Sequence, residues 1–501
     1  MIFASLRVEA VALFAAGGLL AITGCRDARD PALDRGTTVV MAVPDASVLK
    51  PDEWDLDFLT FLPLAVQNEK GELEGRLARS WEHSPDAKEW TYHLRTNVRW
   101  DDGKTVTARD VKFTLDLLAH PAIAEYAGIN ATVVDDSTVR IRAAKAHYID
   151  DIVYYPEHLL RSLDPAKFWE WDFWTHPVGN GAFRFVRYLP ERLVEFEANS
   201  NYYKGKPRVE RVILKFVGAA GLTELLSGNV DIATAEPTQI PRIATDPRFR
   251  IYHHVGPSAN AIYWKSDHPL FQDPRVRRAL TYALDRAELL HAMNLPRDAP
   301  ITDAILTSRQ LRRREWSEPL PYDPAQTRTL LEAAGWVDRN RDGILDKDGR
   351  PFRFTASVSS GTIDEKLAVY VQAQLRRVGV QMEIESVDGS VIWQKLRAAD
   401  FEAWMYVHQA GSLRRDFGSG NPLGYTNPQA FALIEGLEQT ADPDEVDRFY
   451  REISEIFRDD PPMVRLIPAS RTWFVHRRVH GLSTPFHAEP DTYMEDLWVE
   501  R

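Results

Sequence analysis

A single cysteine, Cys25, limits the ways in which this chain of 501 residues can be stabilised. A disulfide needs two cysteines and a four-cysteine zinc site needs four, so the fold has to depend on hydrophobic cores. Cys25 comes directly after the apolar stretch VEAVALFAAGGLLAI, residues 8–22, and the small residues Thr23 and Gly24. A basic start at Arg7, an apolar stretch of about 7–15 residues and a small-residue end are typical of a secretory signal peptide. The stretch is short for a membrane-spanning helix, which needs about 20 apolar residues.

The segment ITGC, residues 22–25, resembles the bacterial lipobox. This resemblance implies that residues 1–24 are a signal peptide, that cleavage occurs before Cys25, and that Cys25 is lipidated. Several acyl chains hold a folded domain at a bilayer, whereas one chain binds only marginally. The polar composition of residues 25–36 predicts a flexible tether that starts at the lipidated cysteine. Plain secretion with a chance cysteine and an uncleaved membrane anchor are the alternatives.

Length, charge and patterning restrict the class of protein. The chain beyond residue 24 exceeds the roughly 250–300 residues that one hydrophobic core usually serves, so at least two lobes are expected. A net charge of −12 without a basic cluster argues against a nucleic-acid partner. Strand-like and helix-like segments alternate irregularly, which indicates an α/β protein.

Several local patterns predict individual elements. Thr107 and Asp110 have the spacing of a capping box at the start of a helix. Another helix is expected over residues 274–293, with Pro274 well placed at its first position. Gly379 is expected to end an amphipathic helix that begins at residue 364. A further helix is expected over residues 444–458. Alternating or β-branched residues predict strands at 37–43, 90–95, 137–143, 183–189, 211–217, 352–358 and 380–387.

Motifs of common enzymes are missing from the sequence. It contains no G-x-S-x-G, no H-E-x-x-H and no Walker A pattern, and Cys25 is assigned to lipid, so hydrolase chemistry is disfavoured. His253 and His254 are adjacent, and on a strand they point to opposite faces rather than to one metal. The sequence therefore predicts a protein that is not an enzyme and needs no cofactor.

Seven segments, in order along the chain, resemble the peptide/nickel/oligopeptide solute-binding proteins, family 5, of ATP-binding-cassette importers. The most specific one is LARSWEHSPDAKEWTYHLRTNVRWDDGKTVTARDVKFTLDLL, residues 77–118, in which Ala87 stands where the family usually has glycine. The others are PVGNGAFRF (177–185), NYYKGKPRVERVILKFV (201–217), ELLSGNVDIA (224–233), FQDPRVRRALTYALDR (271–286), YDPAQTRTLLEAAGW (322–336) and GYTNPQAFALIE (424–435).

The resemblance implies an α/β, two-lobed periplasmic-binding-protein-like fold of class II, in the large form with an extra subdomain in lobe one. Lobe one is expected over residues 37–262, with the inserted subdomain at about 50–165. Lobe two is expected over 263–475, and residues 476–501 return to lobe one. Two crossings between the lobes would form a hinge that closes on a ligand.

The same resemblance implies a function and partners. The expected protein is a lipid-anchored, monomeric clamp on the periplasmic side of a bacterial membrane or on the cell surface. It would capture a small solute such as a peptide and deliver it to permease subunits with their ATPase. A sensing or scaffolding lipoprotein that keeps the clamp without transport is the main alternative, and an extracellular hydrolase is another.

Peptide-binding relatives usually pair the ligand's α-amino group with an aspartate of lobe two, in a segment like A-D-Y-P-D-P. Residues 408–411, His-Gln-Ala-Gly, occupy that region here. Asp416 is the nearest candidate partner for an amine, and Arg414 or Arg415 for a carboxylate, because arginine suits bidentate recognition. An exposed polar loop is the alternative interpretation of these residues.

Other candidate ligand residues are weaker. Lys265 stands where many relatives have asparagine, and it could add positive charge to the cleft or form a salt bridge between lobes. The backbone amides of the loop Gly179-Asn180-Gly181 could meet a polar or anionic group. Trp393, Trp404 and Tyr406 could line the ligand pocket or fill the core of lobe two.

The segment DRNRDGILDKDG, residues 338–349, resembles a calcium loop. Asp338, Asn340 and Asp342 hold ligand positions one, three and five, but Gly349 replaces the bidentate glutamate at position twelve. Because this ligand set is incomplete, no metal is predicted, and the segment is expected to be a turn.

Overall fold

The computed structural model describes residues 35–43, 59–67, 73–86, 88–123, 128–143, 152–234, 239–313, 318–409, 413–440, 442–482 and 494–500. Two compact units divide the chain, Met1–Arg35 and Gly36–Arg501, and nearly all described residues belong to the second. Cys25 and the expected signal peptide lie outside the described residues. In the described part, no helix combines the length and the apolar character needed to cross a membrane.

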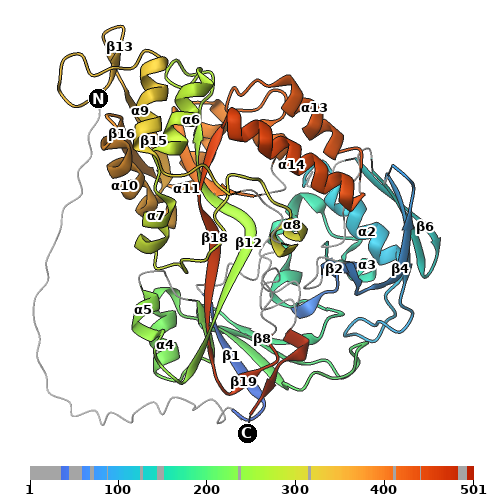
Figure 1. Ribbon diagram of the computed structural model, residues 1–501. Helices are drawn as coiled ribbons and strands as arrows, with labels where there is room; N and C mark the ends of the chain where they lie inside the picture. The colour runs from blue at the N-terminus through green and yellow to red at the C-terminus, as the bar shows by residue number, and fades with distance from the viewer. Residues whose placement is uncertain are drawn as a thin grey trace, which may run out of the picture. The chain divides into compact units, whose positions relative to one another are not determined.

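A ten-stranded mixed sheet runs through the second unit (Figure 1). Its two longest strands, β12 (Phe249–Trp264) and β18 (Met463–His476), lie side by side at its centre. The full strand order is β16 (Gln381–Val387), β15 (Arg353–Ser359), β17 (Ala403–His408), β12, β18, β11 (Ile232–Thr234), β1 (Thr38–Val43), β10 (Arg211–Phe216), β9 (Leu193–Ala198) and β8 (Phe183–Leu189).

Buried apolar side chains in the described ranges form three main cores, which define two lobes. The first core draws on residues 39–232 and 473–497, and we call this part lobe one. The second and third cores draw on residues 261–467, and we call this part lobe two. The pairing of β12 with β18 is interrupted between Val255 and Ala259, where the strands pass from one lobe to the other.

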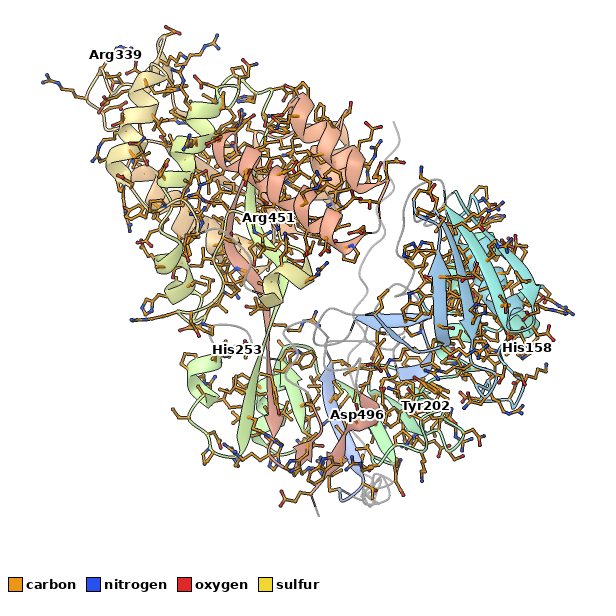
Figure 2. The ribbon with its side chains drawn as sticks, turned by 45° about the vertical axis from the view of Figure 1, so that its right-hand side comes forward. His158, Tyr202, His253, Arg339, Arg451 and Asp496 are labelled. Carbon is orange, nitrogen blue, oxygen red and sulfur yellow. The ribbon has the colours of Figure 1, made fainter. Side chains whose placement is uncertain are left out.

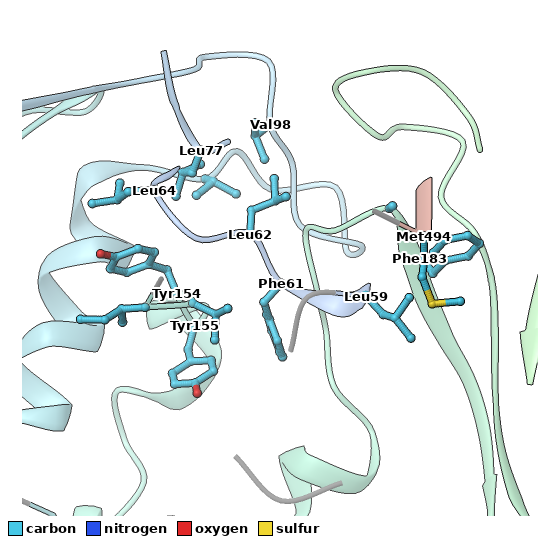
Figure 3. Packing of buried hydrophobic residues seen from close by; sticks show 14 of the residues in the cluster. Leu59, Phe61, Leu62, Leu64, Leu77, Val98, Tyr154, Tyr155, Phe183 and Met494 are labelled. Atoms are coloured by element: carbon cyan, nitrogen blue, oxygen red, sulfur yellow. The ribbon is translucent and has the colours of Figure 1, made fainter. Parts of the chain in front are cut away.

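Lobe one carries a second, antiparallel sheet of four strands, in the order β4 (Ala78–His83), β5 (Glu89–Leu94), β7 (Thr138–Ala143) and β6 (Ile129–Asp135). Helix α2 (Ala108–Leu118) packs on this sheet, and Thr107 and Asp110 form its capping box, as predicted. Figure 3 shows how Leu59 packs near Phe183 while Phe61 lies near Tyr155, so residues 59–64 link the four-stranded sheet to the large one.

Helices cover both faces of the sheet in lobe two. Alternation along β12 sends Ile262 and Trp264 into the second core and Ala261 and Tyr263 into the third. Helices α6 (Pro274–Tyr282), α7 (Arg286–Ala292), α9 (Pro324–Ala333) and α10 (Ile363–Arg376) contribute to the second core. Helices α11 (Gly389–Ala398), α12 (Leu413–Phe417), α13 (Pro428–Leu437) and α14 (Pro443–Asp459) contribute to the third.

The predicted strands and helices are confirmed, with ends that shift by at most three residues, except that the helix expected over 274–293 forms two helices, α6 and α7. Helix α6 has Pro274 in its first turn after the cap Asp273, and Gly379 follows α10 with a φ of 82°. Further helices in the described part are α3 (Glu157–Leu160), α4 (Gly221–Leu226), α5 (Ile240–Ile243), α8 (Ser308–Arg313), and the 3-10 helices at Pro165–Glu170, Asp172–Thr175 and Gly218–Ala220. The remaining strands are β2 (Ala65–Gln67), β3 (Leu73–Gly75), β13 (Asp346–Lys347), β14 (Arg350–Pro351), β19 (Val479–His480) and β20 (Trp498–Val499).

Candidate functional site

The parallel strands of lobe two end beside the interruption in β12. Strands β15, β16 and β17 run parallel, and His408 at the end of β17 pairs with Ala259. In open α/β sheets, ligands bind at the carboxyl ends of the strands. Polar side chains gather at this edge, and we call them the hinge-side polar cluster: Tyr263, Tyr406, His408, Arg415, Asp416 and Arg465.

Asp416 lies inside this cluster and is only 3% exposed. The Arg415 guanidinium donates to both of its carboxylate oxygens, from Nε at 2.7 Å and from Nη2 at 3.2 Å. Nδ1 of His408 lies 3.8 Å from Oδ2. The carboxylate is thus held by neighbouring side chains of the protein, while Arg415 keeps 47% of its own side chain exposed.

His408 is fully buried, and its Nδ1 lies 3.0 Å from the Tyr263 hydroxyl. Burial lowers the pKa of His408, against the opposing effect of Asp416, so the ring is neutral near pH 7. Burial also raises the pKa of the Tyr263 hydroxyl, which therefore stays protonated. Within the described part of the chain, Nε2 of His408 has no hydrogen-bond partner.

Like Tyr263 and His408, Arg465 was not predicted from the sequence as a site residue. It lies on β18 with 6% of its surface exposed, and its Nη2 donates to the carbonyl oxygen of Pro257 at 2.8 Å. Burial lowers the pKa of the guanidinium to about 10, so it remains a cation near neutral pH. A single arginine within the apolar run MVRLI, residues 463–467, is the sequence signal that could have identified it.

The other lobe two candidates have varied surroundings. Arg414 is 53% exposed and donates to Glu438 at 3.1 Å. Trp404 belongs to the third core, and its ring stacks on that of Tyr406 with centroids 5.4 Å apart. The side chain of Trp393 lies outside the described residues.

Lys265 lies at the end of β12 that is farther from the interruption, so the structure does not place it with the hinge-side polar cluster. Its Nζ donates to Oδ1 of Asp267 at 2.5 Å. The residue lines a polar pocket of about 550 Å³ inside lobe two. The pocket is lined by Lys265, Asp267, His268, Pro269, Thr355, Ser357, Glu385, Lys395, Ala399, Asp400, Phe401 and Glu402.

The amides of the loop Gly179-Asn180-Gly181 are used within the protein. The amides of Asn180 and Gly181 donate to the carbonyl oxygen of Thr60 at 2.9 and 2.8 Å, and that of Gly179 donates to Asp101. The Asn180 side chain accepts from the amide of Leu62 at 2.8 Å. In this structure the loop joins neighbouring backbone segments of lobe one, and a role in ligand binding stays a prediction.

Asp101 gives this loop a pH dependence. Burial raises the pKa of its carboxyl to about 7 from 3.8, although the hydrogen bond from Gly179 opposes the shift. The folded protein therefore binds a proton that the unfolded chain releases between about pH 4 and pH 7. We expect the free energy of unfolding of the wild type to fall relative to that of Asp101→Asn as pH rises through this window, and the difference to be constant above it.

Urea unfolding at several pH values measures this effect. Asp86 is the control, because it is exposed and Ser84 lowers its pKa. The difference in free energy of unfolding between wild type and Asp86→Asn should not change above about pH 5. If the corresponding difference for Asp101→Asn were equally independent of pH, the burial argument would be contradicted.

The predicted calcium-like segment is a turn whose oxygens bind its own backbone. Oδ1 of Asn340 accepts from the amide of Asp342 at 3.0 Å, and Oδ2 of Asp338 accepts from that of Gly343 at 3.0 Å. Among the described residues, no group of three or more His, Cys, Asp or Glu could hold a metal ion.

Comparison with known proteins places the chain in a family. The family description "Bacterial extracellular solute-binding proteins, family 5 Middle" matches residues 72–429. The oligopeptide-binding protein AppA of Bacillus subtilis is 24% identical over 484 residues, which cover 89% of this chain and 87% of AppA.

Solved structures share the fold. A putative peptide-binding protein AppA from Clostridium difficile has a TM-score of 0.80 at 21% identity, covering 92% of this chain and 100% of that one. NikZ from Campylobacter jejuni, in complex with Ni(L-His), has a TM-score of 0.76 at 22% identity over 92% and 99% of the two chains. The expected two-lobed α/β fold is confirmed. The chain belongs to family 5 of the bacterial extracellular solute-binding proteins, which act outside the cytoplasm and are not enzymes.

Proposed function

We propose that this protein is the solute-binding lipoprotein of an ATP-binding-cassette importer. It captures a peptide or a related small solute between its lobes and delivers it to the permease and its ATPase. Lipidation of Cys25 holds it at the membrane as a monomer. Family membership supports the solute-binding part. The ligands of similar proteins, an oligopeptide and a nickel–histidine complex, support the solute class.

The observation that carries the proposal is the way in which β12 and β18 join the two lobes. Residues 249–255 pair with 470–476 in lobe one, and residues 259–263 pair with 463–468 in lobe two. Gly256 and Pro257 lie in the interruption between these paired stretches. Because a bulge bends a strand and weakens its ladder locally, this segment can act as the hinge. The expected lobe limits at 262/263 and 475/476 lie a few residues beyond it.

A contact at the surface offers a way to observe closure. Nζ of Lys88, next to β5 in lobe one, donates to Oε1 of Gln439, which follows α13 in lobe two, at 2.6 Å. In a chain with Cys25→Ala, cysteines introduced at positions 88 and 439 are the only thiols. Spin labels on them should show a short distance with bound solute and an additional longer distance without it.

The control uses labels at positions 88 and 116, both in the part of lobe one that carries the four-stranded sheet, whose distance should not respond to solute. The solute is obtained by mass spectrometry of the small molecules that co-purify with the protein. Identical 88–439 distances with and without that solute would count against a closing clamp. Chemical alteration of the solute during incubation would favour the hydrolase alternative instead.

Transport and sensing predict different phenotypes. Deletion of the gene should abolish growth on the co-purified solute as the sole source of its limiting nutrient. Normal uptake in the deletion strain would favour the sensing or scaffolding alternative. Growth has to be measured because a transporter component and a sensor would both bind the solute.

A further inference from the structure

Arg465 is a buried cation that lacks a carboxylate of its own. Among the described residues it forms no ion pair, and its Nη1 has no hydrogen-bond partner. Asp303 attracts it electrostatically, but that carboxylate is already ion-paired with Arg286. The group of two guanidiniums and one carboxylate therefore has one positive charge in excess, at a place from which water is largely excluded.

Such an arrangement is unfavourable for the protein alone. A buried charge destabilises a fold unless a partner of opposite charge and hydrogen bonds compensate for its lost hydration. An arginine whose only requirement was packing could be replaced by an apolar residue of similar length without loss. A missing partner that carries negative charge would explain why the cation is there.

The position of Arg465 fits a ligand group. On the sheet, Ala261 pairs with Tyr406 on one side and with Arg465 on the other, so all three share the face that carries the third core. The small side chain of Ala261 stands between the two long ones. Arg415 lies at the same edge. Besides burial, the charges of both guanidiniums affect the pKa of His408 and of Tyr263. Two cations therefore flank the ends of the parallel strands.

The negative groups at this edge do not cancel that excess. Asp416 is matched by Arg415 through two hydrogen bonds. Asp364, at the start of α10, accepts from Asn260 at 2.9 Å, and burial raises its pKa to about 6, which makes it a weaker acid than usual. Because Asp416 is 3% exposed and matched, it is poorly placed to receive a ligand ammonium.

We propose that Arg465 and Arg415 bind a carboxylate of the solute, so that the preferred solutes are acids and an α-ammonium group is not required. This inference rests on the proposed solute-binding function. The planar guanidinium suits bidentate recognition of a carboxylate, which would give Nη1 of Arg465 its absent partner. The carboxylate could be the C-terminus of a peptide or belong to a non-peptide organic acid.

The first test needs no ligand. Arg465→Met removes the unmatched charge at similar length, so the melting temperature of the solute-free protein should rise. Arg277→Met is the matched control, because Arg277 is equally buried but ion-paired with Asp460, and its loss should lower the melting temperature. A melting temperature of Arg465→Met that falls as far as that of the control would overturn the inference.

The second test uses defined probes in thermal-shift and calorimetric titrations. They are a mixture of tripeptides with free C-termini, the same mixture with C-terminal amides, the same mixture with acetylated N-termini, and the acids succinate, citrate and gluconate. At least one carboxylate probe should stabilise the wild type. Arg465→Met should weaken its binding about tenfold to a hundredfold, the range of a charge-assisted hydrogen bond. Arg465→Lys should recover part of the loss, and Arg277→Met should bind like the wild type.

The outcomes separate the two carboxylate sources and the two proposals. Binding of free-acid peptides but not amides assigns a peptide C-terminus, and binding of the organic acids alone assigns a non-peptide acid. Equal binding of free-acid and amidated peptides, unchanged in Arg465→Met, would overturn the inference and leave solute binding intact. Failure of every carboxylate probe would also overturn it, while the co-purified solute and the 88–439 distance still decide the proposed function.

Discussion

Asp303→Ala is expected to lower the free energy of unfolding by about 3–5 kcal/mol, the usual effect of removing one partner of a buried ion pair. Only 4% of the Arg286 side chain is exposed, and Asp303 is its ion-pair partner. The guanidinium also donates from Nε to the carbonyl oxygen of Arg465 at 2.7 Å. Oδ2 of Asp303 in turn accepts from the amide of Leu320 at 2.6 Å. Loss of the carboxylate therefore leaves a buried cation and a buried amide unmatched.

Arg286 and Arg465 both lie near Asp303, so the substitution removes the negative charge that acts on two buried guanidiniums. Urea denaturation measures the change in free energy. Asp116→Ala is the control, since its pair with Lys112 is exposed on one helix face and is expected to contribute less than about 0.5 kcal/mol. If both variants lost the same small amount, the ion pair of Arg286 would not have the importance that its burial indicates.

Gly179→Ala is expected to destabilise the protein by about 3 kcal/mol or more, because its new methyl group would overlap backbone. A Cβ at this position would lie 2.1 Å from the carbonyl oxygen of Thr60, and one at Gly181 would lie 2.4 Å from that of Leu59. Backbone atoms cannot rotate away as a side chain can. The substitution should separate the loop from residues 59–62, which Figure 3 shows in the middle of the first core.

Gly221→Ala is the matched control for this prediction. Its nearest neighbour would be the Cβ of Ala42 at 3.7 Å, and its φ of −48° suits any residue. The protein should be unchanged or up to about 1 kcal/mol more stable, since alanine has less freedom in the unfolded chain. Thermal and urea unfolding measure the stability of both variants. Equal stability of the two would show that the loop can move away from the Thr60 carbonyl at little cost in free energy.

Local patterns predicted many of the elements well. Capping residues and two-residue alternation act over a few positions, so the helix that begins after Thr107 and strands such as β8 could be derived from the sequence. The long central strands could not be derived in this way. Pro257 lies within β12, and a proline normally argues against a central strand. The structure accommodates it at the interruption, where the ladder to β18 has no regular pairing.

The site shows the same limit. The segment around residue 416 was identified from its neighbours in sequence, but its contacts come from strands far away along the chain. Tyr263 is 145 residues from His408, to which it lies close. Arg465 belongs to a different strand again. Lys265 comes soon after the lobe limit expected at 262/263, but the structure has the interruption of β12 between Val255 and Ala259. Figure 2 labels His253 on the part of β12 that belongs to lobe one, which shows how far this strand extends from one lobe into the other.

The neighbouring course of β12 and β18 has a further consequence. The chain leaves lobe one and returns to it on adjacent strands, so the ends of lobe two lie next to each other. Once lobe two has folded, it brings these ends together, and the entropy of closing a very long loop no longer opposes the remaining pairing. Lobe two is therefore arranged like an inserted domain that, once folded, helps to complete the sheet of its host.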